Sequence, residues 1–209
     1  DASKAAKQQM AAMHQKEAYV KLLEANVQLK AIKPELDSTE AVARTEKSLG
    51  YAAMLCKRVL EKNENNLYAA NGLGCVLGES GRLREAKEVF AMCQEVSAAS
   101  EGFITLPDAW VNLGTVHASM GEYSRAVEIY TSALKRFYRG KDVRLMLYIA
   151  RSLYGAGQGV EARKWMSRAL HIDPNNYRYW FNLAFVITEH AGAVFGEDSA
   201  KKTVFAKKC

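Results

Sequence analysis

A pattern of large and small residues recurs three times between residues 66 and 176, and it limits the folds open to this chain. Each copy has a bulky apolar residue followed directly by a small one, a glycine seven residues later and an alanine five residues after that. Periods of 20 to 50 residues are typical of stacked structural repeats. The three copies, 40 and 36 residues apart, contain Leu73–Gly74, Gly81 and Ala86, then Leu113–Gly114, Gly121 and Ala126, then Ile149–Ala150, Gly157 and Ala162.

The physical reason for the pattern predicts an all-α fold. Two antiparallel helices approach closely only where small side chains meet large ones. A glycine that leaves a helix in the left-handed conformation is expected directly after each first helix, at Gly81, Gly121 and Gly157. The pattern resembles the tetratricopeptide repeat, which implies a right-handed superhelix of antiparallel helix pairs. The small residues that let the helices approach are expected at Gly74, Gly114, Ala150 and Ala184.

The same pattern divides the chain into three predicted parts. Residues 1–50 form an irregular helical flank, residues 51–191 form the repeat array, and residues 192–209 form a basic C-terminal flank. The array comprises a half repeat, three full repeats and the start of a fourth, with a surface loop expected at 97–107. Residues 3–31 are predicted to form one amphipathic helix with an apolar stripe, consisting of Met10, Met13, Val20, Leu23 and Val27. Because the chain begins at Asp1 without a methionine, we expect it to be a fragment.

The glycine-rich stretch 71–81 does not spell a nucleotide-binding loop. Its second gap, between Gly74 and Gly78, is one residue too long for a dinucleotide fingerprint, and Gly81 is followed by Arg82 and Leu83 rather than by Lys and Ser or Thr. No nucleophile–base pair is spelled either, so the sequence predicts no catalytic residues, no cofactor and no enzyme. The four cysteines lack the spacing of zinc ligands, so no metal site is expected and a reducing intracellular compartment is favoured. Cys56, Cys75 and Cys93 lie in apolar helical segments and are predicted to be structural thiols, whereas Cys209 is expected to react first with a thiol reagent.

Charge and hydropathy narrow the expected partners. The apolar runs are short and broken by charges, so no membrane partner is expected. The net charge is +6, and the excess lies mainly towards the C-terminus. The stretch "KRFYRGKDVR" (135–144) interleaves basic and aromatic residues and could bind nucleic acid. Cations at a helix C-terminus also complement the helix dipole, so direct nucleic-acid binding is not expected from the sequence.

The chain resembles the tetratricopeptide family, whose members bind peptides or partner subunits in a groove lined by the first helix of each repeat. The resemblance implies that partner-binding residues lie at the equivalent positions of this chain, where an apolar lining favours a resident protein segment. Asn112 and Asn182 are expected to contact the backbone of that segment. Leu147 and Phe185 could equally well pack between neighbouring repeats instead of binding the segment. The predicted partner-binding residues are Asn71, Val111, Asn112, Thr115, Leu147, Arg151, Phe181, Asn182 and Phe185, with Cys75 beside them.

A more specific resemblance rests on short sequence stretches that the packing of tetratricopeptide repeats does not require. "NLYAANG" (66–72) and "LKRFYRG" (134–140) followed by "LYIARSLY" (147–154) are similar to the large tetratricopeptide scaffold subunit of the Polymerase-Associated Factor (PAF) complex. That resemblance implies a nuclear, non-catalytic scaffold that holds other PAF subunits in a transcription-elongation assembly. It would contact RNA polymerase II and chromatin indirectly and support histone modification. The alternative is a generic tetratricopeptide adaptor or co-chaperone, although the basic clamp of chaperone-binding members is not spelled here.

Overall fold

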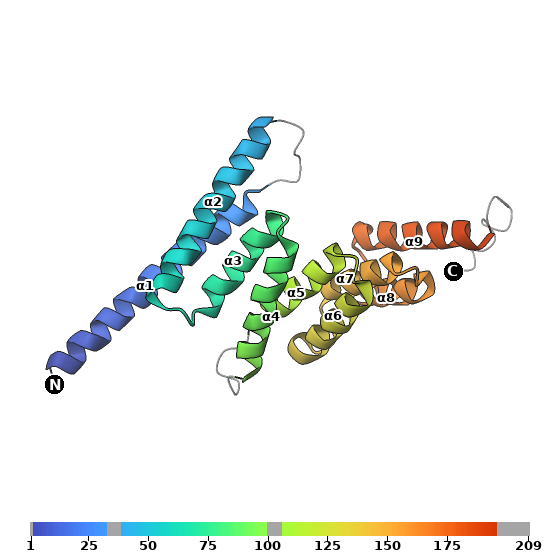
Figure 1. Ribbon diagram of the computed structural model, residues 1–209. Coiled ribbons are helices and arrows are strands. Elements are labelled where there is room, and N and C mark those ends of the chain that lie inside the picture. Colours follow the sequence, from blue (N-terminus) through green and yellow to red (C-terminus); the bar gives the residue numbers. More distant parts are fainter. Residues whose placement is uncertain (1, 33–38, 100–105, 196–209) are drawn as a thin grey trace. The chain divides into compact units, whose positions relative to one another are not determined.

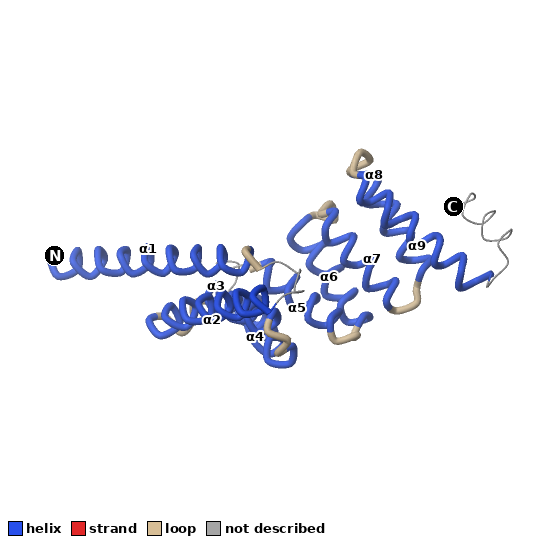
Figure 2. The backbone as a smooth tube through the Cα atoms, turned by 90° about the horizontal axis from the view of Figure 1, so that it is seen from above, coloured by secondary structure: helices blue, strands red, loops and turns tan. Residues whose placement is uncertain are grey.

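The structure is a computed structural model that describes residues 2–32, 39–99 and 106–195 (Figure 1). All regular elements in these ranges are α-helices, as the backbone trace also shows (Figure 2). The chain divides into two compact units, Asp1–Asn112 and Leu113–Cys209, and the division falls inside α5. The helices are α1 (Ala2–Lys30), α2 (Thr39–Lys62), α3 (Leu67–Glu79), α4 (Leu83–Ala99), α5 (Pro107–Ser119), α6 (Tyr123–Tyr138), α7 (Val143–Gly155), α8 (Gly159–Ile172) and α9 (Tyr177–Phe195).

The first unit begins with a hairpin of two long helices. α1 packs along α2, α2 packs on α3, and α3 packs on α4. Small residues of α2 let its neighbours approach, because Ala52 and Cys56 are fully buried beside Leu55. α2 runs without a break through residue 50, so the segment predicted as a half repeat continues a helix that starts at Thr39.

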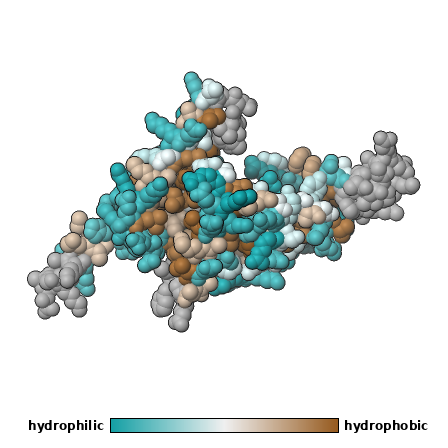
Figure 3. Space-filling model, in the orientation of Figure 1, coloured by the Kyte–Doolittle hydropathy of each residue, from teal (hydrophilic) through white to brown (hydrophobic). Residues whose placement is uncertain are grey.

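The predicted N-terminal helix is confirmed, but its apolar stripe does not form the packed face. The five stripe residues of α1, from Met10 to Val27, are all exposed. The opposite face packs against α2 through Ala25, which is buried between Leu22 and Leu29. A small residue at the centre of the contact lets the two helices come close, and the larger Met and Val side chains would hold them apart. The surface is mainly polar, with apolar residues gathered over part of this unit (Figure 3).

The three turn glycines follow the ends of the first helices as predicted. Gly81, Gly121 and Gly157 have φ angles of 76°, 78° and 76°. The residue after each glycine donates its N–H to a carbonyl five positions earlier, which terminates the helix in the same way each time. These hydrogen bonds run from Arg82 to Leu77 (2.9 Å), from Glu122 to His117 (2.9 Å) and from Gln158 to Leu153 (2.8 Å).

Three of the four predicted small-residue contacts are present. A Cβ atom on Gly74 would lie 2.6 Å from the ring of Phe90, and one on Gly114 would lie 2.6 Å from the ring of Tyr130. Ala150 is fully buried. Ala184 was predicted to be a fourth contact, but it is exposed, because no described helix packs on that side of α9.

The second unit has the same nearest-neighbour packing. α7 packs on α6 and α8, and α8 packs on α9. Its core holds Tyr130, Leu134, Met146 and Ile149. None of the helices in the described ranges is long and apolar enough to cross a membrane. A surface loop was expected at 97–107. Its first three residues belong to α4, Leu106 and Pro107 are described, and residues 100–105 lie outside the described residues.

The turn between α6 and α7 differs from the other turns. Two successive residues, Arg139 and Gly140, have positive φ angles of 51° and 72°. The N–H of Gly140 donates to the carbonyl of Leu134, and Asp142 then caps α7 by accepting from the N–H of Leu145 at 2.9 Å. The chain therefore passes from one helix to the next within four residues.

Candidate partner-binding surfaces

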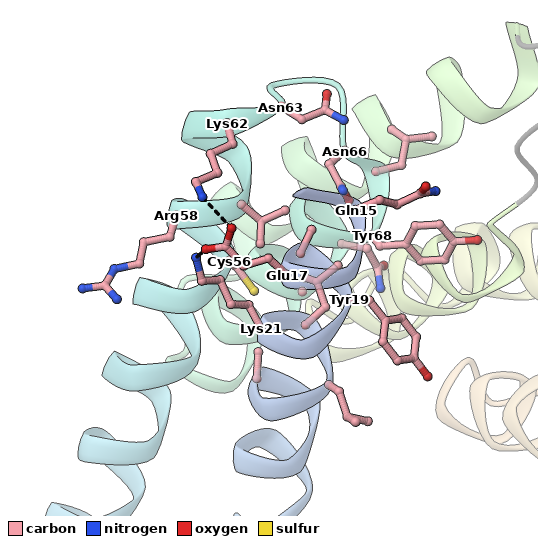
Figure 4. Close-up of a pocket in the computed structure, with 18 of the residues that line it drawn as sticks. Gln15, Glu17, Tyr19, Lys21, Cys56, Arg58, Lys62, Asn63, Asn66 and Tyr68 are labelled. Carbon is pink, nitrogen blue, oxygen red and sulfur yellow. Dashed lines mark hydrogen bonds and ion pairs between the residues drawn. The ribbon is translucent and has the colours of Figure 1, made fainter. Parts of the chain in front are cut away.

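A cleft opens in the first unit beside α1, α2 and α3. Its volume is about 1190 Å³. α1 supplies one wall, the C-terminal end of α2 and the start of α3 supply the other, and Leu106 and Asp108 close one side. Amide and hydroxyl groups line much of it (Figure 4). The polar lining includes Gln15, Tyr19, Asn26, Asn63, Asn65, Asn66, Tyr68 and Asn71.

One predicted residue, Asn71, lines this cleft, and a second, Asn112 of α5, is hydrogen-bonded to Asn71. Asn112 donates from Nδ2 to Oδ1 of Asn71 at 3.0 Å and to Sγ of Cys75 at 3.4 Å. The two hydrogens of the Asn112 amide are therefore used within the protein, and its Oδ1 remains an acceptor. Asn71 keeps its Nδ2 group as a donor that lines the cleft. The pair thus offers one donor and one acceptor, which are the two groups that a peptide unit requires.

The wall formed by α1 is tied to α2 by a carboxylate between two ammonium groups. Glu17 accepts from Nζ of Lys21 at 2.6 Å and from Nζ of Lys62 at 2.7 Å. The hydrogen bond from Lys21, followed by that from Lys62, lowers the pKa of Glu17 from 4.5 to about 2. The Glu17 carboxylate and the Lys62 ammonium face each other across the hairpin in Figure 4.

Two tyrosines of this cleft were not predicted from the sequence. Tyr19 of α1 and Tyr68 of α3 are exposed, and their rings project toward the same side in Figure 4. Tyr68 lies three residues before Asn71, a spacing that places both on one helix face and could have revealed it. Tyr19 belongs to a helix without the repeat pattern, so the sequence carried no signal for it.

The remaining predicted residues lie in the second unit, apart from Val111, which is half-buried in the first. The hydroxyl of Tyr130 donates to Oγ1 of Thr115 at 2.9 Å, and the Tyr130 ring lies 5.5 Å from that of Tyr148. Leu147 is half-buried and Arg151 is exposed on α7. Thr115 is therefore engaged with the second helix of its own repeat and still reaches solvent.

The repeat spacing decides which aromatic residues of α9 belong to a surface. Trp180 is equivalent to Trp110 and Met146, which are both buried, so its 55% exposure marks a core position without a described covering helix. Phe181 is equivalent to Val111 and Leu147, which stay half-buried beside complete neighbours. Phe181, which is 71% exposed, therefore occupies a surface position of the repeat.

Phe185 extends the surface around Phe181. It lies one turn further along α9 and is exposed, and its ring centroid is 5.7 Å from that of Tyr154. Asn182 is half-buried on the same helix. None of the nine predicted binding residues lies in the core, and the second unit brings Phe181, Phe185 and Arg151 onto the first helices of consecutive repeats.

Three of the four thiols lie in the described residues, and the pKa of each is raised. Cys209 lies outside the described residues. Burial raises the pKa of Cys56 to about 11 and that of Cys75 to about 12, so both are protonated at neutral pH. Burial also raises the pKa of Cys93. Across the residues that the structure places, no three His, Cys, Asp or Glu side chains are grouped closely enough to hold a metal ion.

Comparisons with known proteins agree with the repeat pattern. The tetratricopeptide repeat, as a family, matches residues 111–177. The chain is 36% identical over 160 residues to "Protein CTR9 homolog" of Arabidopsis thaliana and 31% identical over 148 residues to "RNA polymerase-associated protein CTR9" of Caenorhabditis elegans. The chain belongs to the CTR9 family of tetratricopeptide-repeat proteins. The resemblance predicted from the sequence is thereby confirmed.

The match covers most of this chain but little of its relatives. It spans 77% of the chain and 14% of the Arabidopsis protein, and 71% of the chain and 12% of the C. elegans protein. A CTR9 protein of Saccharomyces cerevisiae is 34% identical over 86 residues, which are 41% of the chain and 7% of that protein. The chain therefore corresponds to a small part of a CTR9 protein.

Solved structures confirm the fold of this CTR9-family chain. "MamA 41-end" from Desulfovibrio magneticus RS-1 superposes with a TM-score of 0.60 at 17% identity, over 92% of this chain and 94% of that one. "MamA RS-1 ArsTM double mutant" gives a TM-score of 0.60 at 15% identity, over 92% and 93%. At these identities the likeness concerns the fold alone, and the predicted all-α tetratricopeptide-repeat architecture is confirmed.

Proposed function

We propose that this chain is a non-catalytic scaffold segment of a transcription-elongation complex associated with RNA polymerase II, and that it holds partner subunits on its repeat surface. The names of its CTR9 relatives, which include "RNA polymerase-associated protein", support this assignment. The partners are other protein subunits of the PAF complex, and RNA polymerase II and chromatin are reached through them. The proposed site of action is the nucleus.

The observation that carries the proposal is the exposure of Phe181 at a surface position of the repeat. An aromatic ring that is 71% exposed leaves apolar area in water, which a partner side chain would remove. Phe185 and Tyr154 continue the apolar area along the first helices of the repeats. Aromatic side chains at such positions commonly supply most of the binding energy of an interface.

The cleft of the first unit complements this surface with hydrogen-bonding groups. Asn71 and Asn112 together present a donor and an acceptor, and an extended polypeptide displays both groups at every residue. Tyr19 and Tyr68 add two amphipathic rings to the same cleft. A partner segment in this cleft would thus be held through its backbone.

The test compares Phe181→Ser with Val160→Ser in the 209-residue chain. Val160 is an exposed apolar residue of α8, so its replacement removes apolar surface away from the proposed site. Tagged chains are incubated with nuclear extract, and captured subunits of RNA polymerase II-associated complexes are quantified by mass spectrometry. Phe181→Ser should weaken capture by on the order of 2 kcal/mol, which is roughly thirty-fold in affinity, and Val160→Ser should leave it unchanged.

Two results would contradict the proposal. Equal capture by both variants would remove Phe181 from the binding surface, and a large loss of melting temperature in Phe181→Ser would assign it to the core. Recovery of chaperones alone by the parent chain would favour the adaptor or co-chaperone alternative.

A further inference from the structure

The second unit carries a concentrated group of cations that the proposed scaffold function does not use. Five come from the stretch 135–144, and the sixth comes from α8, whose Arg168 donates from Nη2 to the carbonyl of Gly140 at 3.3 Å. All six are exposed. We name this group the basic surface: Lys135, Arg136, Arg139, Lys141, Arg144 and Arg168.

The helix dipole accounts for only part of the basic surface. Lys135 and Arg136 lie in the last turn of α6, where cations are favoured. Arg144 lies in the first turn of α7, where the dipole opposes a cation, and Arg168 reaches the turn from another helix. The sequence alone favoured the dipole explanation because the contribution of α8 cannot be seen in it.

The acidic residue of the stretch, Asp142, pairs with only one of the six cations. Oδ1 of Asp142 accepts from the N–H of Leu145 as the cap of α7, and Oδ2 accepts from Arg144 at 3.3 Å. The Asp142 side chain is 16% exposed, and that of Arg144 is 75% exposed. The carboxylate thus serves the backbone, and the guanidinium of Arg144 remains at the surface.

Two guanidinium groups of the basic surface rest against aromatic rings. The guanidinium carbon of Arg168 lies 5.2 Å from the ring centroid of Trp165, and that of Arg136 lies 5.5 Å from that of Phe137. A ring on one side restricts the orientation of the planar group, and both arginines are exposed. Nucleobases stack on such guanidinium planes, and exposed cations beside them can contact phosphates.

We propose that the basic surface is a binding site for single-stranded nucleic acid, in which Arg136 and Arg168 stack on bases while Lys135, Arg139, Lys141 and Arg144 contact phosphates. An acidic peptide would use the charges but not the stacked guanidinium planes. The site shares no residue with the Phe181 surface or with the cleft of the first unit, so its test is independent of the proposed scaffold function.

The experiment measures fluorescence anisotropy of a labelled twelve-nucleotide single strand of mixed sequence, as RNA and as DNA, with the 209-residue chain. Binding should weaken with salt, with a slope of log K against log salt of about −3, because four phosphate contacts on a single strand contribute about −0.7 each. Arg136→Gln with Arg168→Gln should reduce affinity at least about ten-fold. Affinity for RNA, for DNA or for both would support the proposal and identify the strand type.

Matched variants separate stacking from charge. Arg136→Lys with Arg168→Lys keeps both charges and removes both planes, so single-strand affinity should fall at least about five-fold and duplex DNA affinity should stay within about two-fold. Arg82→Gln with Arg125→Gln removes two arginines that pair with Glu85 and Glu128, and should leave affinity unchanged. Circular dichroism verifies that each variant folds.

Three results would overturn the proposal. The first is absence of single-strand binding by the parent chain at about 50 mM salt, a low concentration at which phosphate contacts are strong. The second is full single-strand affinity in the lysine variant. The third is displacement of the strand by poly-glutamate at equal charge concentration, which would make the basic surface a docking site for acidic peptides instead.

Discussion

Replacing Gly74 by alanine tests how closely α3 and α4 approach. The new Cβ atom would lie 2.6, 2.9 and 3.0 Å from three ring atoms of Phe90. An ordinary carbon–carbon contact is about 3.5–4.0 Å, so the ring or the helix must move by about 0.5–1 Å. Phe90 is 2% exposed and is packed on all sides, which leaves the ring little room.

The sign of the effect follows from two opposing magnitudes. Alanine is more favourable than glycine inside a helix by about 0.8–1.0 kcal/mol. Overpacking a filled core costs about 1–3 kcal/mol. The overpacking is therefore expected to exceed the helix propensity, and Gly74→Ala should lower the free energy of unfolding by about 0.5–2 kcal/mol.

Gly50→Ala is the matched control. Gly50 lies inside α2, and a Cβ atom there would meet nothing within 4 Å. The same substitution should therefore raise stability, by about 0.5–1 kcal/mol. Urea unfolding followed by circular dichroism at 222 nm would measure both variants. If Gly74→Ala were as stabilising as Gly50→Ala, the close contact between α3 and α4 would be disproved.

A double-mutant cycle identifies the ring as the cause. Phe90→Leu removes the part of the ring that faces Gly74, so adding Gly74→Ala in that background should cost less than in the parent chain. An unchanged cost would show that the strain comes from elsewhere.

Three further outcomes are expected. Gly121→Val should lower the free energy of unfolding by roughly 1–2 kcal/mol, because φ is 78° there, and an unchanged melting point would contradict that conformation. Cys56, Cys75 and Cys93 should react with a maleimide at pH 8 far more slowly in the native chain than in urea, since burial raises the pKa of each. Bound zinc at one equivalent per chain that is lost on mutating Cys75 or Cys93 would refute their assignment as structural thiols. Because the pKa of Glu17 is about 2 in the folded chain, below its usual 4.5, its contribution to stability is complete above pH 4.5 and is lost as the pH falls towards 2. Glu17→Gln should accordingly flatten an acid titration of unfolding free energy over that range, and identical curves would rule out the ion pairs.

The helix pairs could be predicted from the sequence because, at certain positions, only one type of residue meets a local structural requirement. Gly81 and its equivalents must leave a helix with positive φ, and Gly74 must admit a ring, so their spacing revealed the helix pairs. Gly72 had no explanation until the structure placed Cys56 Sγ 2.8 Å from where its Cβ would be. Such contacts between helices that are distant in sequence are not encoded in the spacing.

The errors and omissions have the same origin. α1 has apolar residues on two opposite faces, and its period could not show that Ala25, rather than Leu23, packs on α2. Arg139 adopts φ of 51° although arginine gives no signal for it. The meeting of Arg168 with the α6–α7 turn depends on how α7 and α8 pack, as does the contact of Phe185 with Tyr154.

The position of α9 has a consequence for how binding could be detected. α9 packs mainly on α8, whereas α7 is held by helices on both sides. A helix with fewer neighbours opens locally at a smaller free-energy cost, so its amide hydrogens exchange faster than those of α7. Any molecule that covers Phe181 stabilises the closed form of α9 by mass action. Occupancy of this surface should therefore appear as slowed deuterium uptake in α9.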